Sequence, residues 1–225
     1  MLILGHRGAS SAHPENTLEA FAAAYEGGAQ GLEFDVRGDA NNVPVLSHDR
    51  SLQRRAGDAR NVDELTVAEL KTLDVGQGYK IPTFAEALTL AGGRGFLDIE
   101  VKQAGIEKEI LAAVKGYRGQ WGISCFDWDC LATFRSLDRD VKLWLLAINF
   151  SDSLFETASK LGTVGIAMHH SQLNEATMAQ AANAGLSVIA WTVNDAAEAQ
   201  RLADLGCYGL CTDVPELLYM IGRAN

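Results

Sequence analysis

The stretch Leu32-Glu33-Phe34-Asp35-Val36 sets two acidic residues within an otherwise apolar run. Side chains two positions apart on a β-strand share a face, so Glu33 and Asp35 point to one side while the apolar residues point to the other. Two carboxylates this close repel each other when both are ionised, and they need a cation or a shared proton. We interpret the pair as part of a divalent metal site; the alternative is a plain acidic strand face.

The rest of the chain alternates between strand and helix patterns. Predicted strands fall at residues 2–4, 31–36, 95–102, 121–124, 141–147, 164–168, 187–192 and 208–212, each followed by a helix pattern. Regular alternation implies parallel strands joined by helical crossovers, and eight such units predict a single α/β domain, a (β/α)8 TIM barrel. A doubly wound open sheet is the alternative. The domain is expected to span residues 1–225, with an insertion at about residues 43–80.

Capping patterns indicate where several helices begin. Asn16 with Glu19, and Thr83 with Glu86, have the spacing of a capping box. Pro215 is expected to open a closing helix. One short helix is expected within the insertion, starting at Thr66.

Composition narrows the possible partners. The 225 residues carry 19 Lys and Arg against 29 Asp and Glu, a formal charge of −10. An acidic chain repels polyanions, which argues against non-specific nucleic-acid binding. No apolar run is long enough to cross a membrane, so we expect no stable membrane insertion. The four cysteines are interpreted as buried free thiols, in keeping with an expected cytoplasmic location.

Polar side chains gather at the carboxyl ends of the predicted strands, where a barrel of this kind builds its site. They are His6 and Arg7, Glu33 and Asp35, Glu100 and Lys102, Cys125 with Phe126, His169 with His170, Trp191 with Thr192, and Thr212 with Asp213; His48 and Asp49 lie in the loop after the second strand. This concentration at one rim favours a functional site over an incidental acidic face.

The residue types indicate roles. Glu33, Asp35 and Glu100 offer hard oxygen ligands suited to Mg²⁺ or Ca²⁺. His6 and His48 suit a reaction that needs one base and one acid.

The remaining rim residues suit an anionic, partly apolar substrate. Arg7 and Lys102 can neutralise a phosphoryl group, and Phe126 and Trp191 would form apolar walls. Lys102 could also pair with Glu100 or Asp98, and Asp98 is expected to orient it. His169 and His170 are interpreted as structural or rim residues.

Several short motifs resemble the glycerophosphodiester phosphodiesterase family. They are His6-Arg7-Gly8 with Pro14-Glu15-Asn16-Thr17, Glu33-Phe34-Asp35-Val36, His48-Asp49, Ile81-Pro82-Thr83-Phe84, Ile99-Glu100-Val101-Lys102, Trp191-Thr192-Val193-Asn194 and Thr212-Asp213-Val214-Pro215. They follow the family's order along nearly the whole chain. One departure is Arg54-Arg55-Ala56-Gly57-Asp58, which stands where the family often has a Thr- and Gly-rich turn.

The resemblance implies metal-dependent hydrolysis of a small-molecule glycerophosphodiester to sn-glycerol 3-phosphate and an alcohol. It places the metal ligands on Glu33, Asp35 and Glu100, and the catalytic histidines on His6 and His48. It places phosphate contacts on Arg7 and Lys102, and suggests a route through a cyclic phosphodiester.

Two other functions stay open at this point. One is a lysophospholipase D or related phospholipase on the same barrel, which would be expected to carry an exposed apolar rim. The other, from a different class, is a non-catalytic phosphate-binding barrel.

Overall fold

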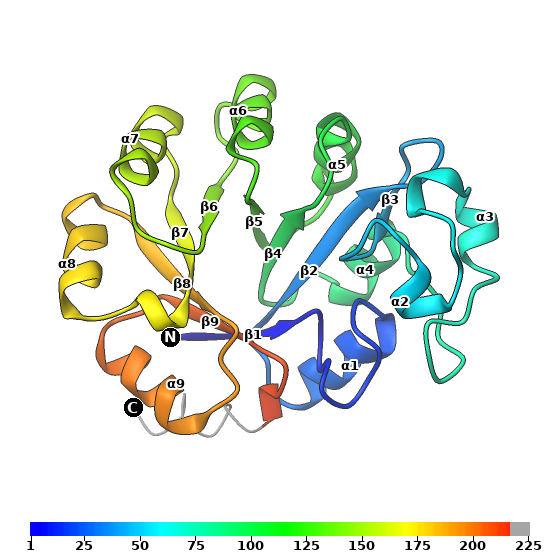
Figure 1. Cartoon of the computed structure of the whole chain (residues 1–225), viewed down its shortest axis with the longest axis horizontal. Helices are drawn as coiled ribbons and strands as arrows, with labels where there is room; N and C mark the ends of the chain where they lie inside the picture. The colour runs from blue at the N-terminus through cyan, green and yellow to red at the C-terminus, as the bar shows by residue number, and fades with distance from the viewer. Residues whose placement is uncertain (217–225) are drawn as a thin grey trace.

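A computed structural model describes residues 1–216 as a closed ring of parallel strands surrounded by helices (Figure 1). In order around the ring, the strands are β1 (Leu2–His6), β2 (Gly31–Gly38), β4 (Phe96–Val101), β5 (Gln120–Cys125), β6 (Leu143–Ala147), β7 (Gly165–His169), β8 (Ser187–Trp191) and β9 (Gly209–Thr212). The first strand, β1, pairs with both β2 and β9, which closes the barrel. The predicted (β/α)8 barrel is confirmed.

Helices between the strands cover the outside of the barrel (Figure 1). They are α1 (Leu18–Glu26), α4 (Phe84–Ala91), α5 (Glu107–Val114), α6 (Trp128–Leu137), α7 (Asp152–Leu161), α8 (Glu175–Asn183) and α9 (Ala196–Asp204), with a short 3₁₀ helix, η2 (His170–Gln172), before α8. The body of the helix expected after Pro215 falls on residues 217–225, outside the described residues. Within residues 1–216, no helix has the length and apolar character needed to cross a membrane.

The segment between β2 and α4 is more structured than the sequence predicted. It holds β3 (Pro44–Leu46), antiparallel to β2, then α2 (Gln53–Ala56), η1 (Val62–Glu64) and α3 (Val67–Leu70). The helix expected to start at Thr66 is confirmed as α3, which Thr66 caps, but α2 and η1 were not expected. The segment buries a small apolar cluster of its own: Val45, Leu52, Val62, Leu65, Leu70, Val75 and Ile81. This burial gives the insertion a packed base beside the barrel.

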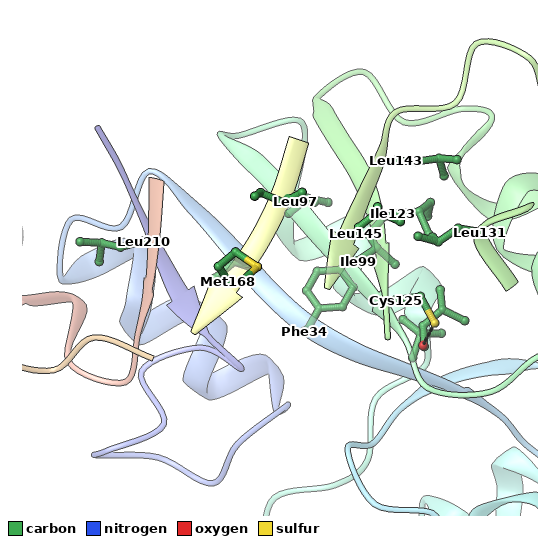
Figure 2. Packing of buried hydrophobic residues seen from close by; sticks show 14 of the residues in the cluster. Phe34, Leu97, Ile99, Ile123, Cys125, Leu131, Leu143, Leu145, Met168 and Leu210 are labelled. Atoms are coloured by element: carbon green, nitrogen blue, oxygen red, sulfur yellow. Dashed lines mark hydrogen bonds between the residues drawn. The ribbon is translucent and has the colours of Figure 1, made fainter. Parts of the chain in front are cut away.

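The main core lies between the strands and the helices, and Phe34 of β2 is at its centre (Figure 2). The ring of Phe34 lies 5.4 Å from that of Phe21 on α1 and 5.9 Å from that of Phe84 on α4, measured between centroids. Because Phe34 faces the helices, Glu33 and Asp35 face the barrel interior. The four cysteines are buried free thiols, as predicted.

Candidate active site

A cavity of about 130 Å³ opens inside the barrel at the carboxyl ends of the strands. Of the residues that were given a metal-binding, catalytic or substrate-binding role from the sequence, all except Asp35 line it: His6, Arg7, Glu33, His48, Glu100, Lys102, Phe126 and Trp191. Asp35 is fully buried and contacts Arg7 and Lys102, which belong to the lining. The structure thus brings the candidate residues together at one end of the barrel.

Three carboxylates form an acidic cluster in the wall of this cavity. Glu33 and Asp35 come from β2, and Glu100 comes from the neighbouring strand β4, where it lies in register with Asp35. One oxygen of each lies within 4.8 Å of the others, and all three residues are buried. A cluster of this size and composition could hold a metal ion.

The protonation of this cluster reflects its crowding. Burial, reinforced by the charges of Asp35 and Glu100, raises the pKa of Glu33 well above its usual value. Burial and the charge of Asp35 likewise raise the pKa of Glu100 to about 7. Buried Oε1 of Glu33 has no hydrogen-bond partner among residues 1–216. An unpartnered carboxylate oxygen among like charges fits a divalent cation, since the cation would supply the missing partner and the missing charge.

Two cationic side chains compensate part of the negative charge. The Nε of Arg7 lies 3.1 Å from Oδ2 of Asp35, and Nζ of Lys102 lies 3.3 Å from Oδ1 of Asp35 and also contacts Glu100. Burial opposes the ionisation of Asp35, but Lys102 and Arg7 outweigh it and hold the pKa of Asp35 below its usual value. Asp35 is therefore the carboxylate that stays charged most readily.

Asp98 does not orient Lys102, so that prediction was wrong. Among the described residues, the ammonium of Lys102 pairs with Asp35 and Glu100, which lie nearer the mouth of the barrel. Asp98 pairs in register with Glu33, one layer deeper, and burial raises the pKa of Asp98 to about 6.

His6 is held by an acidic residue from the far end of the chain. Its Nδ1 lies 2.6 Å from Oδ1 of Asp213, and its Nε2 lies 3.9 Å from Oε2 of Glu33. Asp213 also accepts hydrogen bonds from the hydroxyl of Ser10 and the amide of Asn194, at 2.7 Å each. A carboxylate accepts, so Nδ1 of His6 carries the proton and the Nε2 atom faces the acidic cluster.

His48 has a similar arrangement with its own neighbour in the chain. Its Nδ1 lies 2.7 Å from Oδ1 of Asp49, and its backbone carbonyl accepts a hydrogen bond from Nε of Arg37 at 3.0 Å. Burial lowers the pKa of His48. The two histidines therefore approach the cavity from different elements, each with a carboxylate on the ring nitrogen that points away from the centre.

Two aromatic side chains form another part of the cavity wall. The rings of Phe126 and Trp191 meet edge to face at 5.7 Å, and Nζ of Lys102 lies 5.7 Å from the Phe126 ring. His169 packs against Trp191 at 5.2 Å, and His170 pairs with Glu198 at 2.8 Å. Neither of these two histidines lines the cavity, in agreement with their interpretation as rim residues.

Asn16 does not cap helix α1, so the predicted capping box of Asn16 and Glu19 was wrong. Helix α1 is capped by Thr17, whose hydroxyl accepts a hydrogen bond from the backbone of Ala20. The side chain of Asn16 instead donates to Oδ2 of Asp35 at 2.8 Å and accepts from the backbone N–H of Asp35 at 3.2 Å. A second acceptable capping residue at position 17 was the only signal in the sequence that Asn16 was free for another task.

Asp213 was also missed as a site residue. Its place after the last strand was recognised, but its partner His6 is 207 positions away. Closure of the barrel through β1 and β9 brings the two together.

Comparisons with known proteins agree with this geometry. The model of the glycerophosphoryl diester phosphodiesterase family matches residues 6–217. A glycerophosphodiester phosphodiesterase of Caldanaerobacter subterraneus is 29% identical over 237 residues, covering 99% of this chain and 98% of the relative. The putative glycerophosphodiester phosphodiesterase YhdW of Bacillus subtilis is 31% identical over 245 residues, with 99% and 98% covered.

Solved structures give the same result. An Oleispira antarctica phosphodiesterase, solved in complex with the product sn-glycerol-3-phosphate, superimposes with a TM-score of 0.92 at 26% identity, covering 99% of this chain and 97% of the other. A glycerophosphodiester phosphodiesterase from Thermotoga maritima gives 0.86 at 28% identity, with 98% of each chain covered. The resemblance seen in the motifs is confirmed: the chain belongs to the glycerophosphoryl diester phosphodiesterase family.

Proposed function

We propose that this protein hydrolyses glycerophosphodiesters to sn-glycerol 3-phosphate and an alcohol, with the help of a divalent metal ion. The observation that carries the proposal is the arrangement of one cavity: three buried carboxylates at its wall, flanked by two histidines that are each paired with an aspartate. Family membership and a relative solved with sn-glycerol-3-phosphate support the same substrate class.

Glu33, Asp35 and Glu100 would hold the metal. Their hard oxygen atoms suit Mg²⁺ or Ca²⁺ better than zinc, which more often recruits histidine or cysteine. When bound, such an ion offsets phosphoryl charge and makes a nearby hydroxyl more acidic. Asn16 keeps Oδ2 of Asp35 turned towards Arg7, which leaves Oδ1 of Asp35 on the side of Lys102.

The two histidines would move the protons. One imidazole takes the proton from the glycerol hydroxyl beside the phosphate, whose oxygen then attacks phosphorus, and the other gives a proton to the departing alcohol. The bond to the alcohol breaks and a cyclic phosphodiester remains. Water then opens the ring with the two roles exchanged. Asp213 and Asp49 keep each imidazole in the tautomer that presents Nε2 to the substrate.

The remaining lining residues would bind and orient the substrate. Arg7 and Lys102 are positively charged and lie at the cavity, so they can stabilise the negative charge of the phosphoryl oxygens. Phe126 and Trp191 offer an apolar face to the carbon atoms of the glycerol.

A lysophospholipase D activity is the second candidate, and one observation favours it. Phe126 is 44% exposed, and Ile148, which follows strand β6 at the same end of the barrel, is 58% exposed. These side chains give the aromatic side of the mouth an apolar edge that an acyl chain on the glycerol could cover. The insertion does not contribute such an edge, because its apolar residues are turned inward into their own cluster.

An assay of two substrates tests the proposal. The protein is freed of metal with a chelator and then given Mg²⁺ or Ca²⁺ with glycerophosphocholine or with a 1-acyl lysophosphatidylcholine. Release of sn-glycerol 3-phosphate that depends on the added metal is the expected result. Faster release of lysophosphatidic acid would favour the second candidate. Absence of any chelator-sensitive hydrolysis across a panel of diesters would support the non-catalytic alternative.

A further inference from the structure

We propose that Arg54, on the insertion helix α2, is a positioning residue that fixes both His48 and Arg7 in the site. Its guanidinium lies between two carboxylates from separate parts of the chain. The Nε of Arg54 donates to Oδ2 of Asp49 at 2.5 Å, and the two terminal nitrogens donate to the carboxylate of Glu15 at 2.7 and 3.2 Å. This inference deepens the proposed function and rests on it for the roles of His48 and Arg7.

Each of the two carboxylates holds a residue of the cavity. Asp49 binds Nδ1 of His48 through its other oxygen, at 2.7 Å. Glu15 accepts a hydrogen bond from Nη1 of Arg7 at 3.2 Å, and Arg7 in turn lies 3.1 Å from Asp35. Two contact chains therefore start at Arg54: one reaches an imidazole, the other reaches a carboxylate of the acidic cluster.

Arg55, on the same helix, supports the contacts that run through Glu15. Its guanidinium donates to the backbone carbonyls of Glu15 and Val75 at 3.2 Å each. Val75 belongs to the apolar cluster of the insertion. Glu15 is thus fixed through its backbone as well as its side chain, and the packed insertion supplies a rigid base for both contacts.

The exposure of these groups argues for a positioning role over a purely stabilising one. The side chain of Arg54 is 50% exposed and that of Asp49 is 30% exposed. Ion pairs this close to solvent contribute little to folding, because water screens them and the side chains lose entropy. Activity is more sensitive than stability to the loss of such a contact. Removing a partner that holds an active-site residue typically lowers activity by about 10–100-fold.

The test uses the full chain with matched substitutions. Arg54→Gln removes both contacts, and Arg54→Lys keeps the charge but lacks the fork that reaches two carboxylates. Arg50→Gln is the control, because Arg50 lies on the same segment and binds Asp63 at 2.9 Å in an ion pair that is also exposed to solvent. Thermal unfolding should show the three variants folded, with similar midpoints.

The first measurement needs no substrate. Proton–nitrogen NMR spectra of the imidazoles report whether Nδ1–H of His48 stays hydrogen-bonded, with the signal identified by its absence in His48→Gln. Arg54→Gln is expected to shift this signal or lose it to exchange with water, while Arg50→Gln leaves it in place. An unchanged His48 signal in Arg54→Gln overturns the inference, even if the chain were to show no phosphodiesterase activity at all.

The second measurement is kinetic. Arg54→Gln should lower kcat about 10-fold or more with KM changed less than about threefold, and Arg54→Lys should fall between it and the wild type. In the double variant Arg54→Gln/Asp49→Asn, the loss should be smaller than the product of the two single losses, because both changes break the contacts through Asp49 and only Arg54→Gln also breaks those through Glu15. A kcat within about twofold of wild type for Arg54→Gln, or fully multiplicative losses in the double variant, would overturn the role through Asp49.

Discussion

Nδ1 of His6 lies 2.6 Å from Oδ1 of Asp213, although 207 positions separate the two residues in the chain. The first strand of the barrel ends at His6 and the last strand ends just before Asp213, so their pairing depends on closure of the ring. Asp213 is itself fixed by Ser10 and Asn194. The barrel thus supplies one imidazole in a single orientation and tautomer.

Asp213→Asn should impair catalysis with little effect on the fold. An amide can accept from Nδ1–H only in one orientation, and it carries no charge to stabilise an imidazolium, so kcat should fall by about 10²-fold or more. Steady-state kinetics on glycerophosphocholine and far-UV circular dichroism measure the two quantities. Turnover above half the wild-type value would show that His6 does not need Asp213 for catalysis.

Acid stability gives an independent view of the same contact. Burial opposes ionisation of Asp213, but hydrogen bonds and the charge of His6 outweigh it and hold the pKa of Asp213 below its usual value. Because the folded-state pKa is lowered, this carboxylate stabilises the fold at higher pH, and that stabilisation is lost as the pH falls through the folded pKa. Urea unfolding with chelator present should show that the difference in free energy of unfolding between wild type and Asp213→Asn becomes smaller below about pH 4. A constant gap across this range would contradict the lowered pKa.

His48→Ala should lower kcat by about 10²-fold or more while leaving the fold intact, because it removes one of the two proton-transfer groups. His170→Ala is the control, since His170 lies at the rim in an ion pair with Glu198 and does not line the cavity. The control should retain wild-type turnover. Equal losses in the two variants would show that histidine position within the cavity does not matter, contrary to the proposal.

Much of this architecture could be predicted from local patterns. The alternation of strand and helix signals fixed the barrel, and the period-two pattern around Phe34 correctly placed Glu33 and Asp35 on the inner face. Strand ends then identified the rim, because in parallel barrels the carboxyl ends of all strands meet at one side. These inferences need only the chain's own periodicity.

Side-chain partners could not be predicted in the same way. Asn16 fits a capping box by its spacing, but Thr17 next to it also fits, and only the folded structure shows that Asn16 binds Asp35. Glu100 and Asp98 share a strand face with Lys102 and were both possible partners for it, yet its ammonium contacts Glu100 and, on the neighbouring strand, Asp35. Choices of this kind depend on three-dimensional distances and on competing charges.

The acidic cluster should cost stability when no metal is present. Replacing Glu33 with Gln removes a buried carboxylate whose pKa is raised by burial and by its acidic neighbours. At about pH 8 the metal-free variant should therefore unfold at the same temperature as the wild type or higher. Calcium at about 100 times its Kd should stabilise the wild type by about 2.7 kcal/mol and leave Glu33→Gln unchanged.

Glu175→Gln serves as the control for this experiment, because Glu175 is an exposed acid on α8 away from the cavity. Calcium should raise the free energy of unfolding of Glu175→Gln by as much as it does for the wild type. A calcium response that persists in Glu33→Gln would place the ion elsewhere.

The most direct test of the account is a crystal structure of the protein grown with Ca²⁺. The account predicts one ion bonded to an oxygen of each of Glu33, Asp35 and Glu100 at about 2.3–2.6 Å, with Lys102 displaced from Glu100 towards the cavity. An ion bound at another place, or a cluster in which the ammonium of Lys102 still bridges Asp35 and Glu100 at saturating calcium, would contradict it.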